Sequence, residues 1–173
     1  KQQKVEKSID YFKIAADCGH TDSIFKYGLK LNEISTTQSE KQESLRYLKK
    51  ASDKGNNKAT YHYGDIIVEG DYGIPSNPNV GSRYIRIAAY NGDADAYGAY
   101  GTLLQMGNGV PTNLELAGQY YLAGISKGSS IAMHDYAYML ENGVGIPLNY
   151  DLAMKYYRMA IDLGHVQSLS DYA

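Results

Sequence analysis

The segment Tyr84-Ile85-Arg86-Ile87-Ala88-Ala89-Tyr90-Asn91-Gly92 contains the pattern that decides the fold: a tyrosine, a small residue four positions later, and a glycine four positions after that. The pattern occurs five times, as Tyr11/Ala15/Gly19, Tyr47/Ala51/Gly55, Tyr84/Ala88/Gly92, Tyr120/Gly124/Gly128 and Tyr156/Ala160/Gly164. Successive glycines of the pattern lie 36 or 37 residues apart in the 173-residue chain. Spacing this regular predicts a tandem repeat.

Each repeat is predicted to form two antiparallel helices. Apolar side chains around the tyrosine form one helical stripe, seen in the fifth copy at Ala153, Tyr156, Tyr157, Ala160 and Ile161. The glycine that follows supplies the left-handed residue that ends the helix, so the chain reverses there. First helices are expected near residues 5–18, 41–54, 78–91, 114–127 and 150–163, and second helices near 21–33, 58–69, 94–106, 130–141 and 166–173.

Polar residues beside the turns predict where the helices begin. The expected N-caps of the second helices are Thr21, Asn57, Asp93 and Ser129, and those of the first helices are Asn77, Asn113 and Asn149. Between a second helix and the next first helix the chain has glycine-containing loops, at 70–75, 107–111 and 143–147, which we interpret as structural turns.

Together these signals predict an all-α fold: a right-handed α-solenoid of about five antiparallel helix-pair repeats. Small residues in the alanine and glycine columns allow neighbouring helices to approach closely, and the tyrosines fill the space beside them. The chain is expected to be one array over residues 1–173. Its repeats would lie near 5–40, 41–77, 78–113, 114–149 and 150–173, the last of them incomplete.

The charge balance favours protein partners over polyanions. The chain has 17 Lys and Arg against 19 Asp and Glu, giving a formal net charge of -2. No overall positive field would attract nucleic acid or an anionic membrane. Other proteins are therefore the expected partners.

Hydropathy and cysteine content say little about the compartment. The longest apolar stretches, such as Ile66-Ile67-Val68, are far shorter than the ~20 residues of a membrane span. With a single cysteine, Cys18, no internal disulfide can form, and there is no Asn-x-Ser/Thr sequon. These features favour an intracellular location, and the lumen of the endoplasmic reticulum remains open.

The reactive residue types do not form a recognisable catalytic pattern. None of the four histidines stands at a metal-ligand spacing from another ligand residue. Cys18 is expected to be a small buried residue, since nothing in its setting would stabilise a thiolate. We therefore predict no catalytic, metal or cofactor-binding site, and a protein that is not an enzyme.

With these residues laid out, the chain resembles the Sel-1-like repeat family, the longer-period relatives of tetratricopeptide repeats. The family pattern is present here as Ala88-Ala89, Gly92, Ala96, Gly101 and Gly107-Asn108-Gly109-Val110. The period of 36 to 37 residues separates this chain from the 34-residue tetratricopeptide pattern. One difference is that tyrosines such as Tyr63 and Tyr100 stand one helical turn earlier than the family's usual aromatic residue, which is expected to change the local packing.

A column of basic residues is the candidate binding surface. Lys13, Lys49, Arg86 and Arg158 stand two positions after the pattern tyrosine, and Arg46, Arg83 and Lys155 stand one position before it. The resemblance implies that first helices line a concave face, where these cations would form a ladder that binds an acidic or carboxylate-bearing peptide. The alternative interpretation is an ordinary solvated surface.

The expected function is therefore that of a non-catalytic protein-protein interaction scaffold that binds partners on its concave surface. The alternative is a structural segment of a larger multiprotein assembly, with no exchangeable ligand.

Overall fold

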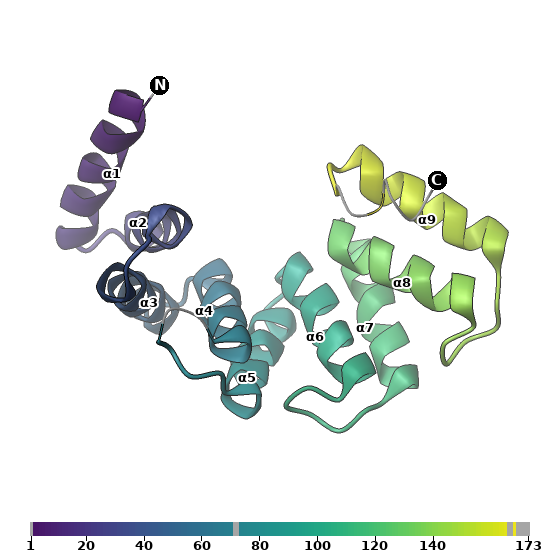
Figure 1. The fold of residues 1–173 in the computed structure, drawn as a ribbon. Coiled ribbons are helices and arrows are strands. Elements are labelled where there is room, and N and C mark those ends of the chain that lie inside the picture. Colours follow the sequence, from purple (N-terminus) through teal and green to yellow (C-terminus); the bar gives the residue numbers. More distant parts are fainter. Residues whose placement is uncertain (1, 71–72, 166–167, 169–173) are drawn as a thin grey trace. The chain divides into compact units, whose positions relative to one another are not determined.

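The computed structural model describes residues 2–70, 73–165 and 168, and in these ranges it is all-helical, with nine helices and no strand (Figure 1). The helices are α1 Gln2–Asp17, α2 Thr21–Ile34, α3 Gln38–Asp53, α4 Asn57–Glu69, α5 Pro78–Tyr90, α6 Ala94–Met106, α7 Leu114–Ser126, α8 Ser130–Asn142 and α9 Tyr150–Asp162. The predicted all-α fold class is confirmed. The second helix expected near 166–173 lies outside the described residues, except for Ser168.

Helix α3 begins three residues earlier than predicted, because Thr37 and Glu40 form a capping box. The backbone N–H of Glu40 donates to the Thr37 hydroxyl, and the backbone N–H of Thr37 donates to the Glu40 carboxylate. Hydrogen bonds from Thr37 and Thr36 hold the pKa of Glu40 below its ordinary value. The signal was present in the sequence as Thr-x-x-Glu.

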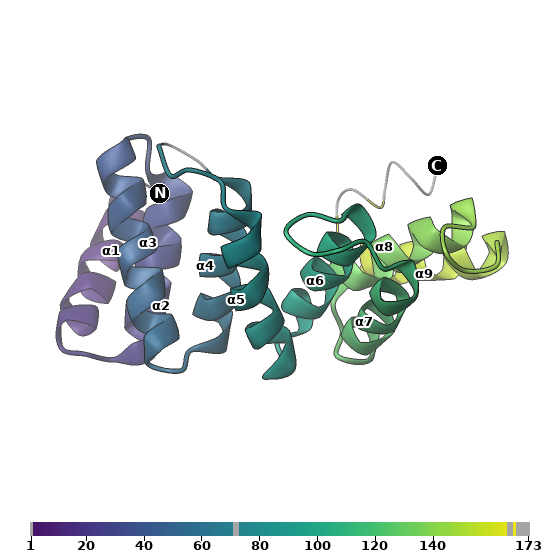
Figure 2. The same cartoon turned by 90° about the horizontal axis from the view of Figure 1, so that it is seen from below.

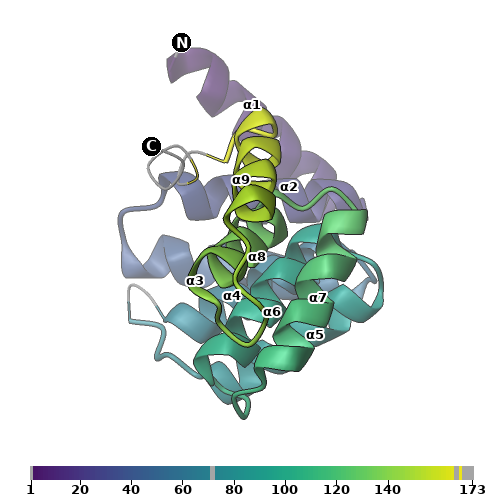
Figure 3. The ribbon, with the colours of Figure 1, turned by 90° about the vertical axis from the view of Figure 1, so that its right-hand side faces the viewer.

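The chain divides into two compact units, Lys1–Tyr84 and Ile85–Ala173. In the first unit α1 packs on α2, α2 on α3, and α3 on α4, and the second helices α2 and α4 also meet (Figure 2). In the second unit α6 packs on α7, α7 on α8, and α8 on α9, with α6 against α8 (Figure 3). Successive helices therefore stack on one another within each unit. The single array over residues 1–173 stays a prediction.

The five turn glycines adopt the predicted left-handed conformation. Their φ angles are +89° at Gly19, +84° at Gly55, +93° at Gly92, +83° at Gly128 and +86° at Gly164. An L-residue with a side chain is strained there, which explains why glycine ends each first helix.

The residue directly after the turn glycine is the N-cap of the next helix. Asp93 and Ser129 each accept a hydrogen bond from the amide three residues on, as predicted. The predictions of Asn57 and Thr21 were wrong by one position, because the caps are Asn56, which bonds the amide of Ala59, and His20, which has no side-chain cap bond. The caps Asn77, Asn113 and Asn149 of the first helices are confirmed.

The core follows the position after four of the five pattern tyrosines, whereas Phe12, after the first, is only partly buried. Leu48, Ile85, Tyr121 and Tyr157 are at most 1% exposed. The small columns beside them are equally buried, with Ala51, Ala88 and Ala160 at 0%. Close approach requires these small residues: a Cβ atom at Gly124 would lie 2.7 Å from the Cβ of Ala132.

Cys18 departs from prediction. It is exposed, not buried, because it follows α1 and lies beyond the inward-facing position that Ala16 occupies.

Candidate protein-binding surface

A pair of tyrosines marks each junction between consecutive repeats. One member stands eight residues after the turn glycine, on a second helix, and the other is the pattern tyrosine of the next first helix. The ring centroids are 4.6 Å apart in Tyr27–Tyr47, 4.8 Å in Tyr63–Tyr84, 4.8 Å in Tyr100–Tyr120 and 5.5 Å in Tyr136–Tyr156. The tyrosines that stand one turn earlier than in the family pattern therefore pack against the following repeat in edge-on or tilted geometry.

The basic column two positions after the pattern tyrosine lies beside these pairs. The Lys13 ammonium is 6.0 Å from the ring centroid of Tyr27, and the Lys49 ammonium is 6.0 Å from that of Tyr63 and 5.9 Å from that of Tyr84. These distances are within cation–π range. The cations are thus held over aromatic faces.

Arg86 occupies the same column in the second unit, and its charge affects the pKa of the Tyr120 hydroxyl. Burial raises the pKa of the Tyr120 hydroxyl, Tyr100 adds to the rise, and the positive charge of Arg86 opposes it. In the next repeat the position is filled by Leu122, which is exposed. The column therefore carries a cation at Lys13, Lys49, Arg86 and Arg158 and an apolar side chain at Leu122.

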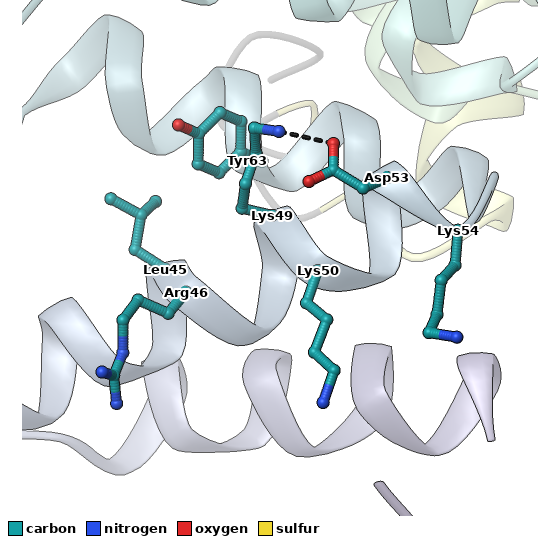
Figure 4. A pocket seen from close by; sticks show the side chains of 7 residues that line it. All are labelled: Leu45, Arg46, Lys49, Lys50, Asp53, Lys54 and Tyr63. Atoms are coloured by element: carbon teal, nitrogen blue, oxygen red, sulfur yellow. Dashed lines mark hydrogen bonds and ion pairs between the residues drawn. The ribbon is translucent and has the colours of Figure 1, made fainter. Parts of the chain in front are cut away.

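In the first unit, Arg46 and Lys49 line a surface depression of about 490 Å³ (Figure 4). The other lining residues are Leu45, Lys50, Asp53, Lys54 and Tyr63. Lys49 forms an ion pair with Asp53, and this hydrogen bond raises the pKa of the Lys49 ammonium. Charge at this end of the depression is therefore largely compensated within the protein.

The cations of the depression other than Lys49 form what we call the α3 basic stripe: Arg46, Lys50 and Lys54. They are spaced by four residues, so they follow one face of α3. All three are exposed, and Figure 4 shows their side chains directed to the opposite side from Lys49 and Asp53. Sequence reasoning identified Arg46 but missed Lys50 and Lys54, although the spacing of four was the available signal.

The remaining predicted site residues are dispersed. In the first unit, Lys13 on α1 and Arg83 on α5 are exposed, and neither lines the depression that contains Arg46 and Lys49. In the second unit, Lys155 and Arg158 are exposed on α9.

Arg86 lines a second depression, of about 420 Å³, together with Ile87, Tyr90, Tyr97 and Tyr120. Two of its lining side chains are unusually exposed for apolar residues: Tyr90 is 89% exposed and Ile87 is 49% exposed. The repeat spacing in the sequence predicted Arg86 as a site residue but not the aromatic residues around it.

A polar network inside the second unit was also not anticipated. The Thr102 hydroxyl donates to Asp135 Oδ2 at 2.6 Å, and His134 Nδ1 lies 2.8 Å from Asp135 Oδ1. The carboxylate stands between the hydroxyl and the imidazole, whereas a nucleophilic triad needs the imidazole beside the hydroxyl. The Tyr121 hydroxyl donates to Gln105 Oε1 at 2.9 Å. The arrangement is that of a structural network joining α6, α7 and α8.

Two features of the described residues concern metal ions and membranes. Within residues 2–70, 73–165 and 168, no group of three or more His, Cys, Asp and Glu side chains is placed to hold a metal ion. In the same ranges, no helix combines the length and apolar character that crossing a bilayer requires.

Stacked helix pairs with glycine-ended first helices and an exposed surface of cations and aromatic rings define a helical-repeat protein. The Sel1 repeat family model matches residues 2–20, 22–56, 57–93, 94–129 and 130–165. The chain belongs to the Sel1 repeat family. The resemblance inferred from the sequence is thereby confirmed, and repeats of this family are generally protein-interaction scaffolds.

Solved structures agree on the fold. A Sel1 repeat protein from Oxalobacter formigenes is 28% identical, with a TM-score of 0.83 over 96% of this chain and 66% of its own. The protective antigen c5321 of uropathogenic Escherichia coli is 20% identical, with a TM-score of 0.71 over 95% of this chain and 35% of its own.

Helicobacter pylori cysteine rich protein B is 23% identical, with a TM-score of 0.57 over 75% of this chain and 92% of its own. No curated protein sequence matches the chain. Among the solved structures, the chain spans just under two thirds of the Oxalobacter protein and about a third of the Escherichia coli antigen.

Proposed function

We propose that this chain is a non-catalytic scaffold that binds acidic segments of partner proteins through the cations of its first helices. The observation that carries the proposal is the position of those cations: Lys13 and Lys49 lie over tyrosine rings, and the α3 basic stripe extends along an exposed helix face. The proposed contact residues are Lys13, Arg46, Lys49, Arg83, Arg86, Lys155 and Arg158, with Lys50 and Lys54 added by the structure.

A physical argument favours this surface over an ordinary solvated one. A lysine whose ammonium already lies beside a ring, as those of Lys13 and Lys49 do, has fewer conformations to lose when it binds an anion, so less of the interaction energy is spent on ordering. The α3 basic stripe concentrates three positive charges along one helix face of a chain whose net charge is negative. Local field, not total charge, would therefore select acidic segments.

The non-catalytic part of the proposal rests on the family, since the Sel1 repeat fold is typically non-catalytic. In the Thr102–Asp135–His134 cluster the carboxylate, not the imidazole, lies beside the hydroxyl, which differs from the order of a Ser-His-Asp triad.

Two double charge reversals test the proposal. Arg46→Glu with Arg158→Glu changes exposed first-helix residues, whereas Lys26→Glu with Lys58→Glu changes exposed second-helix residues. Both variants change the net charge by the same amount. The probe is a fluorescein-labelled decapeptide of alternating glutamate and glycine, and binding is followed by fluorescence anisotropy at low ionic strength.

The wild-type protein should bind the probe, the first-helix variant should bind it more weakly, and the second-helix variant should bind it nearly as well as wild type. Equal weakening in both variants would mean that only net charge matters, and the proposed surface would be wrong. Circular dichroism of both variants should match that of the wild type, which excludes unfolding as the cause.

A further inference from the structure

Three residues that line the depression around Arg86 stand at the same repeat positions as three that line the depression around Lys49. Arg86, Ile87, Tyr90 and Tyr97 stand 37 residues after Lys49, Lys50, Asp53 and Thr60, respectively. Ile87 therefore stands where the preceding repeat has a lysine, Tyr90 where it has an aspartate, and Tyr97 where it has a threonine. The two depressions therefore share three lining positions, and their chemistry differs at Ile87 and Tyr90, whereas Thr60 is buried and does not line the first depression.

The first consequence is that Arg86 lacks the internal partner that Lys49 has. Lys49 is paired with Asp53, but Tyr90 stands at the corresponding position after Arg86. Across the described part of the chain, the side chain of Arg86 makes no ion pair or hydrogen bond with another residue. An exposed guanidinium that has no carboxylate partner within the protein can donate two parallel hydrogen bonds to a carboxylate of a bound ligand.

The second consequence is an aromatic wall next to that guanidinium. The rings of Tyr97 and Tyr120 are 6.0 Å apart and inclined by 44°, so they do not stack closely on each other. Tyr90 and Ile87 add exposed apolar surface on α5. A volume of about 420 Å³ falls within the range of small ligand sites and accommodates a single aromatic side chain.

The charge around the wall excludes cationic ligands. Besides Arg86, the ammonium of Lys127 lies 5.9 Å from the Tyr97 ring centroid. Aromatic cages for methylated ammonium groups rely on an uncompensated negative ring face, and two cations beside these rings remove that preference.

We propose that this depression binds an aromatic side chain with a carboxylate beside it, presented by an extended segment of a partner protein. The ring would rest against Tyr97, Tyr120 and Ile87, and the carboxylate would pair with Arg86. Tyr90 would cover the ring from the solvent side. The inference refines the proposed function, since it assigns a sequence preference to one part of the partner-binding surface.

Three blocked dipeptides test the proposal by chemical-shift titration of the ¹⁵N-labelled chain. The probe is N-acetyl-Phe-Glu-amide, and the controls are N-acetyl-Phe-Gln-amide, which lacks the charge, and N-acetyl-Ala-Glu-amide, which lacks the ring. We expect the probe to bind about fivefold to tenfold more tightly than either control, with the largest shifts at Ile87, Tyr90, Tyr97 and Tyr120.

Two exposed substitutions assign the two halves of the preference. Arg86→Gln should remove the preference for Glu over Gln and retain that for Phe over Ala. Tyr90→Ser should reduce the preference for Phe over Ala about threefold and retain that for Glu. Lys58→Gln, an exposed second-helix substitution that lines neither depression, should change neither ratio.

Equal binding of all three dipeptides, or a preference that persists in Arg86→Gln, would overturn the proposal. The outcome is separable from that of the charge-reversal experiment. If the glutamate-glycine decapeptide binds through Arg46 and Arg158 while the dipeptides show no preference, only the aromatic-carboxylate site is wrong. If the dipeptides bind as expected and the decapeptide shows no dependence on Arg46 and Arg158, the site stands without the wider basic surface.

Discussion

Asp65 provides a pH-dependent test of packing in the first unit. Its carboxyl lies on α4, and burial, followed by the nearby charge of Glu69, raises its pKa from 3.8 to about 6. Because the pKa is higher in the folded state, the folded protein holds this proton more tightly. The contribution of Asp65 to stability is therefore fully present below pH 3.8 and is lost as the pH rises through about 6.

The size of the effect follows from the pKa difference. A change from 3.8 to about 6 corresponds to about 3 kcal/mol, since a tenfold change in proton affinity equals about 1.4 kcal/mol. Asp65→Asn keeps the size and polarity of the side chain and removes its charge. The variant should match the wild type near pH 4 and exceed its unfolding free energy by up to about 3 kcal/mol above pH 7.

Urea unfolding followed by circular dichroism, from pH 4 to pH 8, measures this difference. The unfolding midpoint of Asp65→Asn should move above that of the wild type by about 1–2 M at pH 7.5. Glu69→Gln is the matched control and should give a smaller gain in the same direction, because Glu69 is the lesser cause. A difference between Asp65→Asn and wild type that stays constant across this pH range would refute the reasoning.

Three further substitutions test the turn, the helix crossing and a buried hydroxyl by thermal unfolding. Gly92→Val should destabilise more than Gly92→Ala, which should cost about 1 kcal/mol, because a β-branched residue is more strained at φ +93°; equal melting temperatures would mean that the turn tolerates side chains. Ala88→Leu should cost about 1–3 kcal/mol by overpacking a position that is 0% exposed, and a stabilising effect would show unfilled space there. Tyr157→Phe should cost about 0.5–1.5 kcal/mol, since the hydroxyl donates to Glu141 Oε2 at 2.8 Å; an unchanged melting temperature would show that this hydrogen bond adds nothing.

The fold was predictable because its determinants are local and periodic. A glycine at positive φ, a small residue at a crossing and a polar cap each act within one or two helical turns, so their spacing in the sequence carries the information. Errors arose where one residue decides the outcome. Asn56 rather than Asn57 caps α4, and Cys18 lies just beyond the inward-facing stripe.

The binding surface was less predictable, because its chemistry depends on side chains that meet from different helices. Periodicity placed Lys49 and Arg86 in one column but could not show that Asp53 neutralises the first and that tyrosines surround the second. Nor does a spacing pattern reveal how far Asp65 is buried. Such properties arise from packing between repeats, and the sequence pattern describes each repeat singly.

The central claim is that exposed cations of the first helices bind acidic segments, and the most direct test is one ratio of dissociation constants. For the glutamate-glycine decapeptide, the constant of Arg46→Glu/Arg158→Glu is divided by that of Lys26→Glu/Lys58→Glu. We predict a ratio of about 3, since each reversed contact, at about 0.7 kcal/mol, weakens binding on its own unit by roughly that factor. A ratio close to one would contradict the claim.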